Sequence, residues 1–576
     1  MKFDAVPIVI GVTGHRAIAQ DAQPALRAKF ADVLDGYATR YAASAPPLVL
    51  CGLAAGADIL AAEVALERNV PVIACLPAAQ ETYERDFSDE ERERFRNALS
   101  RCSGTIVVGN GEHPTRGYAD LASFLVYYSA VIVAFWDGSA GRGAGGTADL
   151  VRMREASPDL GPVLHIVTPR SGEPPPHDAF AVREIYAQRP TVDLETHEKR
   201  RHAQTPLERD RAAFEKVLSN LDRFNADVAS TGSPSSAAAS LEGFQLAADR
   251  AADRLQKWTL QSLRWLYIVG GIAIAAQLVV QQPLTQISPV ATGIRFGLLA
   301  IAGVWFRFAK RQDYENRYQD YRAIAEALRV QQAWCSAGLR DRLVEASYLQ
   351  MQQSELQWIR LALRTIYLIS GARDARPSDS LAHPDCAAWV GGQHAYYEKA
   401  ARVQVRAQRR IFRASSTLMG IGGAISALAV IASLLRAGVG PIAIHAAGMH
   451  LSLLAHKWSL YSAWPGLHAA GNLAQWLLYF MTVPASLLGM IVLLLQFYAQ
   501  QRGYAENARR YQRMFEVFDL ASRRLADPSG DRAQVLTALG HEALSEHADW
   551  LILHRERPMR VISGITHVQA APRSQR

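Results

Sequence analysis

The strongest constraint on this chain is a set of long stretches that contain no charged residue. Thirty consecutive positions, 265–294, lack Asp, Glu, Lys and Arg, and the stretches 414–435 and 458–501 contribute 22 and 44 further positions. A helix needs about 20 mainly apolar residues to cross the hydrocarbon core of a bilayer. The chain therefore combines membrane-spanning helices with a soluble part. Its mean hydropathy of −0.03, which is typical of a soluble enzyme, averages over the two.

These stretches predict four spans, because 265–294 holds one helix and a turn, and the segment after it returns across the membrane. The return helix carries Arg295 and Arg307 near its ends, where long side chains reach the interface. The predicted spans are roughly 264–282, 292–309, 415–435 and 475–498. The alternative interpretation is a set of buried helices in a large soluble core.

Basic residues mark one side of these spans. They are Lys310 and Arg311 after the second span, Lys399, Arg402, Arg406, Arg409, Arg410 and Arg413 before the third, and Arg502, Arg509, Arg510 and Arg513 after the fourth. Because basic loops stay in the cytoplasm, we expect a multi-pass protein of the inner (cytoplasmic) membrane with both termini and the segment 310–413 in the cytoplasm. The run 399–413 adjoins a span and has few aromatic residues, which favours attachment to the lipid bilayer surface. No nucleic-acid partner is expected, although the net charge is +8.

The first 170 residues alternate short apolar runs with helical patterns. The predicted strands are Pro7–Val12, Pro47–Cys51, Val70–Leu76, Thr105–Val108, Ala130–Phe135 and Val163–Thr168, and the predicted helices lie near 22–40, 56–68, 87–101, 119–129 and 146–156. Strands separated by helices form a parallel sheet covered on both faces. The predicted fold class is thus a doubly wound, Rossmann-like α/β domain followed by an all-α membrane region with four transmembrane helices.

Three glycine-bearing turns follow strands of this domain: GVTGHR (11–16), GLAAGAD (52–58) and WDGSAGRGAGGTAD (136–149). Ligands of open α/β sheets bind beyond the carboxyl ends of the strands. Glycine lets backbone N–H groups approach a phosphate, and the following helix N-terminus favours negative charge. The turns therefore predict a nucleotide-type small molecule as ligand, with purely structural turns as the alternative.

Twelve residues of these turns are the candidate ligand-binding residues. They are Thr13, Gly14, His15, Arg16, Gly52, Gly56, Asp58, Asp137, Gly145, Gly146, Thr147 and Asp149. We expect His15 and Arg16 to contact phosphate or base and Thr147 to add a hydroxyl hydrogen bond. Asp58 and Asp149 either accept from ribose hydroxyls or cap their helices.

Two common nucleotide chemistries fit the sequence poorly. No GxxxxGK[ST] motif occurs, which argues against P-loop hydrolysis. The segment GRGAGG (141–146) matches GxGxxG, but it follows the fifth strand, and the next strand carries no acidic residue for a ribose, which argues against dinucleotide oxidoreduction. No catalytic residue, metal ligand or required cofactor is predicted.

The N-terminal motifs resemble those of the SLOG superfamily, the Rossmann-like group that includes LOG phosphoribohydrolases and DprA/Smf proteins. The similarity rests on four motifs in order over residues 1–170: Gly11–Arg16, Gly52–Asp58, Leu76–Phe87 (LPAAQETYERDF) and Trp136–Asp149. The resemblance implies binding of nucleotides or nucleotide-derived signals. The related domain of melastatin-type ion channels also binds nucleotide ligands.

One departure from that family bears on chemistry. LOG hydrolases carry a PGGxGTxxE motif whose Glu takes part in cleaving an N-glycosidic bond. Aligning Gly146 and Thr147 with this motif places Leu150 at the Glu position, and Asp149 lies one residue early. Proton transfer requires hydrogen-bond contact, so the sequence favours sensing over hydrolysis. A membrane-tethered nucleotide phosphoribohydrolase or nucleotide-modifying enzyme is the alternative.

The membrane segments resemble the two-span SLATT effector domains that accompany SLOG domains in bacterial conflict systems. The resemblance covers 250–345, and a weaker second copy covers 395–530, with YENRYQDYRAIAEAL (314–328) aligning to YAENARRYQRMFEVF (504–518). It implies a homo-oligomeric channel or pore, or membrane disruption, in antiviral defense. The predicted organisation is 1–170 sensor, 171–255 connector, 256–345 first hairpin, 346–413 helical segment, 414–530 second hairpin and 531–576 C-terminal helix and tail.

Two other functions of the membrane part are disfavoured by its residues. No span has a carboxylate or Lys near its middle, which argues against an ion-coupled transporter. His445, His450 and His456 lie in the predicted outer loop. If that loop is helical, these histidines cannot converge on one metal ion, because they differ in face or in height along the axis.

Overall fold

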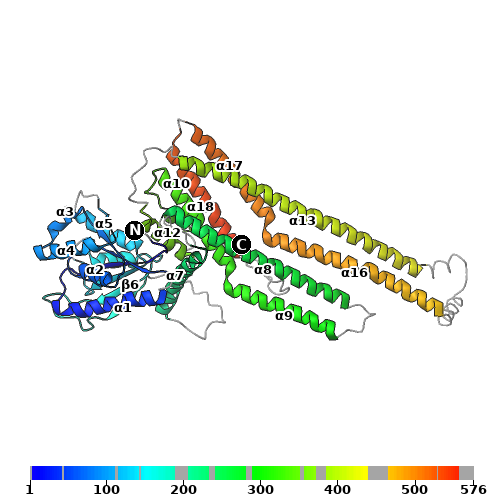
Figure 1. The fold of residues 1–576 in the computed structure, drawn as a ribbon, viewed down its shortest axis with the longest axis horizontal. Helices are drawn as coiled ribbons and strands as arrows, with labels where there is room; N and C mark the ends of the chain where they lie inside the picture. The colour runs from blue at the N-terminus through cyan, green and yellow to red at the C-terminus, as the bar shows by residue number, and fades with distance from the viewer. Residues whose placement is uncertain are drawn as a thin grey trace, which may run out of the picture. The chain divides into compact units, whose positions relative to one another are not determined.

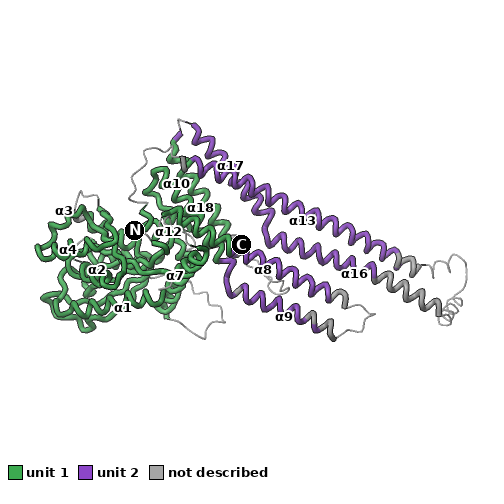
Figure 2. Tube along the Cα trace, viewed as in Figure 1, with its two compact units in different colours: residues 1–254, 317–386, 531–554 green, residues 255–316, 387–530, 555–576 purple. Residues whose placement is uncertain are grey.

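The computed structural model of the chain consists of two compact units, each described by itself (Figure 2). Unit 1 comprises residues 1–254, 317–386 and 531–554, and unit 2 comprises residues 255–316, 387–530 and 555–576. The structure describes residues 3–41, 44–109, 114–141, 145–187, 205–232, 240–280, 289–349, 356–371, 384–438, 465–527 and 530–556. The three histidines of the predicted outer loop lie outside these residues.

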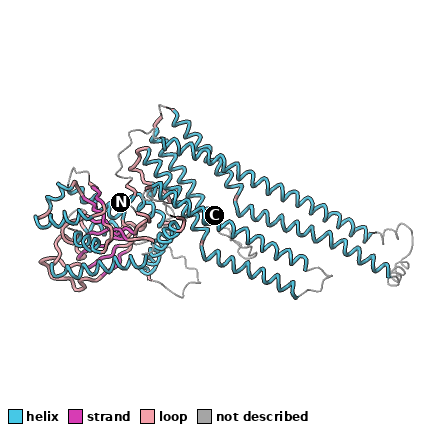
Figure 3. Tube along the Cα trace, viewed as in Figure 1, coloured by secondary structure: helices cyan, strands magenta, loops and turns pink. Residues whose placement is uncertain are grey.

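A seven-stranded sheet forms the core of the N-terminal part of unit 1, with the order β4-β3-β2-β1-β5-β6-β7 (Figures 1 and 3). Its strands are β1 (Ile8–Gly14), β2 (Pro47–Cys51), β3 (Val72–Leu76), β4 (Gly104–Val107), β5 (Val131–Trp136), β6 (Val163–Val167) and β7 (Val182–Ile185). Strands β1 to β6 pair in parallel, and β7 is antiparallel to β6. The predicted α/β fold is confirmed for this part of the chain.

Helices cover the sheet in two groups. They are α1 (Gln23–Tyr41), α2 (Ala57–Glu67), α3 (Gln80–Tyr83), α4 (Asp89–Arg101), α5 (Pro114–Tyr128) and α6 (Thr147–Glu155), with short 3₁₀ turns η1 (Gln20–Ala22) and η2 (Glu84–Asp86). Helix α2 contacts α1 and α4, and α5 contacts α6. Right-handed crossovers to opposite sides of β1 place these groups on opposite faces, as in a doubly wound sheet.

Most of these strands and helices begin and end within two residues of the bounds predicted from the sequence, but β7 was not predicted. This strand has the pattern VREI, in which Val182 and Arg183 are exposed, and it follows the proline-rich segment SGEPPPHD. An exposed edge strand buries too little to show a clear apolar alternation. The sheet therefore continues beyond residue 170, where the sequence pattern placed the end of the sensor.

The rest of unit 1 is helical and comes from distant parts of the chain. Its elements are α7 (Pro206–Ala229), the beginning of α8 (Leu241–Val280), most of α10 (Tyr314–Ser336), α11 (Val344–Ser347), α12 (Gln357–Ile369) and most of α18 (Arg532–Glu556). Helix α12 contacts α7 and α5, and 12 of its 13 residues are buried. The indole of Trp334 in α10 donates to the carbonyl oxygen of Leu536 in α18 at 3.0 Å, so α18 belongs to the same core.

Unit 2 contains the remainder of α8, the helix α9 (Pro289–Gln312), nearly all of α13 (Pro384–Gly438), and the helices α16 (Pro465–Arg502) and α17 (Tyr504–Ala526) (Figure 1). The rings of Tyr267 in α8 and Tyr498 in α16 lie 5.8 Å apart. A Cβ on Gly422 of α13 would meet the Leu488 side chain of α16 at 3.5 Å. Helix α16 therefore packs against both α8 and α13.

Three segments of the described chain are helical, long and apolar enough to cross a membrane: Leu241–Ala276, Cys386–Ile431 and Phe480–Ala526. They indicate a multi-pass membrane protein. The segment 292–309 lies within helix α9, which is not among the three. The fourth span stays a prediction.

The two aligned segments of the internal repeat have the same local geometry. Helices α10 and α17 both have 23 residues and begin at the aligned tyrosines Tyr314 and Tyr504. Each follows a residue with positive φ, which is 52° at Asp313 and 60° at Gly503. The shared left-handed turn and equal length support an internal duplication.

Candidate functional site

A cavity of about 470 Å³ lies at the carboxyl ends of β1 and β5. These two strands are neighbours in the sheet, and the helices that follow them cover opposite faces. This is the switch point at which open α/β sheets bind ligands. The volume lies within the usual range of small-molecule sites, which is about 300–1,000 Å³.

Eight of the twelve candidate residues line this cavity: Thr13, Gly14, His15, Arg16, Asp58, Gly145, Gly146 and Thr147. They come from the three glycine turns, which the fold brings to one edge of the sheet. The other four, Gly52, Gly56, Asp137 and Asp149, are not among the lining residues. The carbonyl oxygen of Gly52 accepts the hydroxyl of Tyr83 at 3.1 Å, and the contacts of the other three are described below.

Two glycines allow close backbone approaches in the cavity wall, Gly56 to the turn after β1 and Gly145 to helix α5. Gly56 has φ of +83°, and a Cβ there would lie 2.2 Å from the carbonyl oxygen of Arg16. Gly145 has φ of +78°, and its Cβ would lie 2.5 Å from the backbone of Tyr118. Both positions combine the left-handed backbone that favours glycine with no room for a side chain. Any other residue would push the cavity wall apart.

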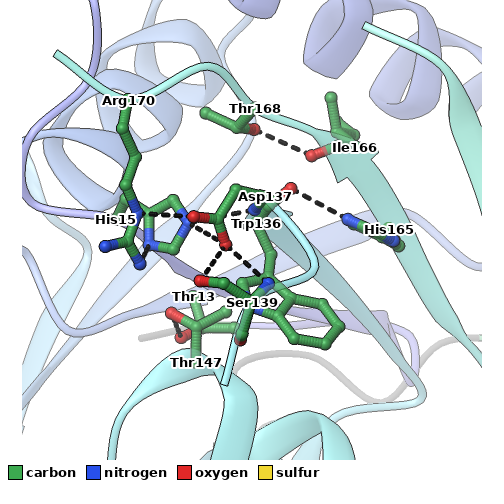
Figure 4. A network of polar contacts seen from close by, with 10 residues as sticks. All are labelled: Thr13, His15, Trp136, Asp137, Ser139, Thr147, His165, Ile166, Thr168 and Arg170. Atoms are coloured by element: carbon green, nitrogen blue, oxygen red, sulfur yellow. Dashed lines mark hydrogen bonds and ion pairs between the residues drawn. The ribbon is translucent and has the colours of Figure 1, made fainter. Parts of the chain in front are cut away.

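A partly buried network fixes the loop after β1 to the loop after β5 (Figure 4). The His15 ring lies between the two charged groups: Nε2 is 3.1 Å from a carboxylate oxygen of Asp137, and Nδ1 is 3.1 Å from a guanidinium nitrogen of Arg170. Arg170 also forms an ion pair with Asp137 at 2.7 Å. Because a guanidinium only donates, Nδ1 accepts from Arg170, as in a neutral imidazole. Nε2 faces both the backbone N–H of Asp137, at 3.0 Å, and the carboxylate of the same residue.

The electrostatics of the network agree with this assignment. Burial lowers the pKa of His15, and the positive charge of Arg170 lowers it further, against the opposing effect of Asp137. Burial alone would raise the pKa of Asp137, but hydrogen bonds from the Ser139 backbone and hydroxyl, with the nearby His15 and Arg170, lower it. The network therefore holds an ionised carboxylate, a neutral imidazole and a charged guanidinium.

The N-terminus of α6 faces the cavity beside the end of β1. The hydroxyls of Thr13 and Thr147 lie 3.3 Å apart (Figure 4), and Gly146 precedes the first turn without a side-chain cap. The first backbone N–H groups of a helix lack intrahelical acceptors, and the helix dipole makes this end positive. An anionic group of a ligand would be stabilised at this point.

Arg16 supplies a cation at another side of the cavity. Its guanidinium donates to the hydroxyl of Tyr118 at 2.8 Å and lies 4.0 Å from the Asp86 carboxylate. The Tyr118 hydroxyl in turn donates to Asp86. Burial and this hydrogen bond to a carboxylate raise the pKa of Tyr118 to about 12. Since the Arg16 side chain is 48% exposed, it remains accessible to a ligand.

Asp58 is a buried carboxylate in the cavity wall. One oxygen accepts the N–H of Ala54 at 3.4 Å, which stabilises the turn after β2. Burial raises the pKa of Asp58 to about 7, against the lowering effects of backbone hydrogen bonds and of Arg16. The side chain thus both shapes the turn and carries a proton that titrates near neutrality.

At the position where LOG hydrolases carry their Glu, this chain has the apolar residue Leu150, in the first turn of α6. Asp149 accepts the N–H of Gly145 at 3.2 Å and pairs with Arg152, so its carboxylate closes the glycine turn. Leu150 is buried and lines the cavity. Of the two roles expected for Asp149, the structure shows a contact that stabilises the turn.

Sequence reasoning missed four residues of the site: Tyr118, Asp86, Ser139 and Arg170. Arg170 comes shortly after the predicted strand Val163–Thr168, and the rule that the carboxyl ends of parallel strands share one edge would have pointed to it, but it was not applied there. Asp86 belongs to the segment LPAAQETYERDF, which had no assigned role. Tyr118 lies within helix α5 and has no local pattern that signals a site.

No protein-family model and no curated protein matches the chain. The described residues contain no group of three or more His, Cys, Asp or Glu side chains that could hold a metal ion. The site is therefore interpreted from its own geometry.

Proposed function

We propose that this protein is a membrane effector controlled by a cytoplasmic domain that binds a nucleotide or a nucleotide-derived signal. The observation that carries the proposal is the cavity at the switch point of the sheet, bordered by the N-terminus of α6 and by two arginines. The helix end and Arg170 suit a phosphate group. The ring of Tyr118 and the half-buried indole of Trp136 offer surfaces for a base.

A direct structural link from this cavity to the helices of unit 1 supports control by the ligand. Tyr118 lines the cavity near the start of α5, and Tyr127 near the end of α5 donates to Glu345 in α11. Helix α6 begins in the cavity wall, and Asp159 beyond its end accepts from Gln357 of α12 at 2.7 Å. Both helices that border the ligand site therefore end against α11 and α12.

In the proposed mechanism, the ligand stabilises one packing of α5 and α6 against α12 over another. It does so only to the extent that its affinities for the two states differ. The membrane part is a homo-oligomer of four-span subunits, with α9 as the fourth span and both termini in the cytoplasm. The packing change opens a pore or perturbs the bilayer, which fits a role in antiviral defense.

The test uses the full-length protein in dye-loaded liposomes and a panel of nucleotides identified by mass spectrometry of small molecules that co-purify with it. We expect a co-purifying nucleotide to trigger leakage. Arg16→Ala should weaken its binding about 10- to 100-fold, since a charge-assisted hydrogen bond contributes about 1.5–3 kcal/mol, and Gly146→Trp should fill the site. The matched control is Arg68→Ala, which removes an arginine paired with Asp35 outside the cavity. Leakage that survives both site variants would contradict the sensor assignment.

Asp58 favours a second candidate, a nucleotide-cleaving or nucleotide-modifying enzyme. A buried carboxylate with a pKa of about 7 in a ligand cavity is suited to general acid or base catalysis. Incubation of the full chain with nucleoside monophosphates, followed by chromatography for free base, distinguishes the two. Release of base that stops in Asp58→Asn would favour the enzyme; intact recovery of a bound nucleotide would favour the sensor.

A further inference from the structure

Six basic residues of α13 lie on one face of the helix, directly before its apolar segment. They are Lys399, Arg402, Arg406, Arg409, Arg410 and Arg413. With 3.6 residues per turn, they fall within an arc of about 100°. All six are exposed. We call this face the basic stripe.

The neighbours of α13 pack on the opposite face. Tyr397 contacts Tyr511 and Phe518 of α17, and Gly422 faces Leu488 of α16. Tyr397 precedes Arg406 by nine residues, a rotation of about 180°. The basic stripe is therefore directed away from the packed helices of unit 2.

The cations of the basic stripe are largely unneutralised. Arg402 forms an ion pair with Glu398 one turn earlier. Within the described part of the chain, none of Arg406, Arg409, Arg410 and Arg413 has an acidic partner, and the sequence from 399 to 413 contains no acid. An exposed row of unpaired arginines attracts a polyanion or an anionic surface.

The apolar segment that follows the basic stripe indicates that the anionic surface is the lipid bilayer. The uncharged stretch begins at Ala414, and each headgroup layer is about 5–7 Å thick. At 1.5 Å per residue, Arg409, Arg410 and Arg413 fall within about 6 Å along the axis, whereas Arg406 lies about 10 Å from Arg413. The Phe412 side chain, 71% exposed, lies at the same level and offers an apolar contact to acyl chains.

We propose that Arg409, Arg410 and Arg413 form a docking site for the phosphate groups of anionic phospholipids. The guanidinium groups bind lipid phosphates by charge-assisted hydrogen bonds, and Phe412 contacts the adjoining acyl chains. Lys399, Arg402 and Arg406 lie above the headgroup layer and contribute a weaker, salt-screened attraction. This site is independent of the nucleotide cavity.

The experiment measures binding of dioctanoyl phosphatidylglycerol to the full-length protein in neutral detergent, by native mass spectrometry and by the shift in unfolding midpoint. The variant R409Q/R410Q/R413Q should bind at least tenfold more weakly. Its matched control, K399Q/R402Q/R406Q, removes the same charge from the same stripe and should stay within about twofold of the parent. R409K/R410K/R413K retains the charge and should recover most of the binding.

Several outcomes would overturn the proposal. If the two glutamine variants bind the lipid equally weakly, the attraction is diffuse and there is no docking site. If neither variant binds more weakly than the parent, the basic stripe does not bind lipid. Equal binding of dioctanoyl phosphatidylcholine would exclude selection of anionic lipid. Equal binding of glycerol 3-phosphate would reassign the triad to free phosphate. If R409Q/R410Q/R413Q binds the lipid like the parent but no longer binds a single-stranded oligonucleotide, the three arginines are a nucleic-acid site.

Discussion

The guanidinium of Arg364 lies over the ring of Tyr127, 4.7 Å from its centroid, and donates a hydrogen bond to the backbone carbonyl of the same residue. The Tyr127 hydroxyl donates to Glu345, whose carboxylate also lies 3.6 Å from Arg364. The end of α5 is thereby held by α11 and α12 at once. All three side chains are in unit 1, and Arg364 and Glu345 are buried.

Tyr127→Phe tests whether this contact couples the cavity to the helices. The variant keeps the ring under Arg364 and removes only the hydroxyl that bonds to Glu345. Nucleotide affinity should be unchanged, because Tyr118 and Arg16 are untouched, while ligand-triggered leakage should fall about tenfold or more. Tyr186→Phe is the control, since it removes a hydroxyl bonded to Glu184 on β7. Loss of either hydrogen bond should cost about 1–3 kcal/mol of stability. Identical leakage in the two variants would argue against coupling through α5.

Asp58 makes the stability of unit 1 depend on pH. Its pKa of about 7 in the folded state lies above the ordinary value near 4, so the folded protein binds a proton that the unfolded chain has released. The contribution of Asp58 to the free energy of unfolding therefore falls as pH rises from about 4 to 7 and is constant above that. Asp58→Asn should be more stable than the parent by a few kcal/mol at pH 8, and this difference should shrink toward pH 4. Thermal unfolding of the full chain in detergent across this range measures it; a difference that does not change with pH would refute the shift.

Gly56→Ala and Gly138→Ala separate backbone strain from steric clash. The two glycines have φ of +83° and +85°, but a Cβ on Gly138 meets nothing within 4 Å, whereas one on Gly56 lies 2.2 Å from a backbone oxygen. Gly138→Ala should lower the free energy of unfolding by about 1 kcal/mol. Gly56→Ala should cost several kcal/mol and weaken nucleotide binding, since the Arg16 loop must move. Equal unfolding midpoints would show that the close approach of the turns is unimportant.

Gly271→Val and Gly270→Val test the packing of α8 on α16. A Cβ on Gly271 lies 3.0 Å from the Leu494 side chain, while one on its neighbour Gly270 meets nothing within 4 Å. Close helix contacts in membranes depend on small residues. Gly271→Val should lower the unfolding midpoint in detergent by several degrees, and Gly270→Val should leave it nearly unchanged. The reverse order would mean that α8 packs through another face.

The sequence predicted the sheet well because its parallel strands are buried on both faces, which produces apolar runs such as PLVLC (47–51) with sharp ends. It also located the cavity, because glycine turns after strands meet at one edge by topology alone. It was unable to predict that Gly56 and Asp149 support the turns while Gly146 and Thr147 line the space. That distinction depends on side-chain direction, which residue type does not encode.

Contacts between segments that are distant in the sequence were the feature of the structure that the sequence predicted least well. Nothing near Gln357 or Tyr127 signals that α12 packs on α5, since the apolar pattern of α12 fits any buried helix. Arg154 is a comparable case: its guanidinium is buried and donates to the carbonyl oxygens of Ser129 and Ala130 at 2.9 and 2.8 Å. A sequence-based assignment would place such an arginine at the surface.

The composition of unit 1 from three separate stretches limits how the protein can be divided. A fragment ending near residue 240 would keep the whole sheet but lose α12, whose buried side chains cover α5 and α7. It would expose this apolar face to water and favour aggregation. The domain that contains the cavity is thus not a transferable module: gene fusions or truncations that follow the linear order of the chain would separate it from the helices that complete its core.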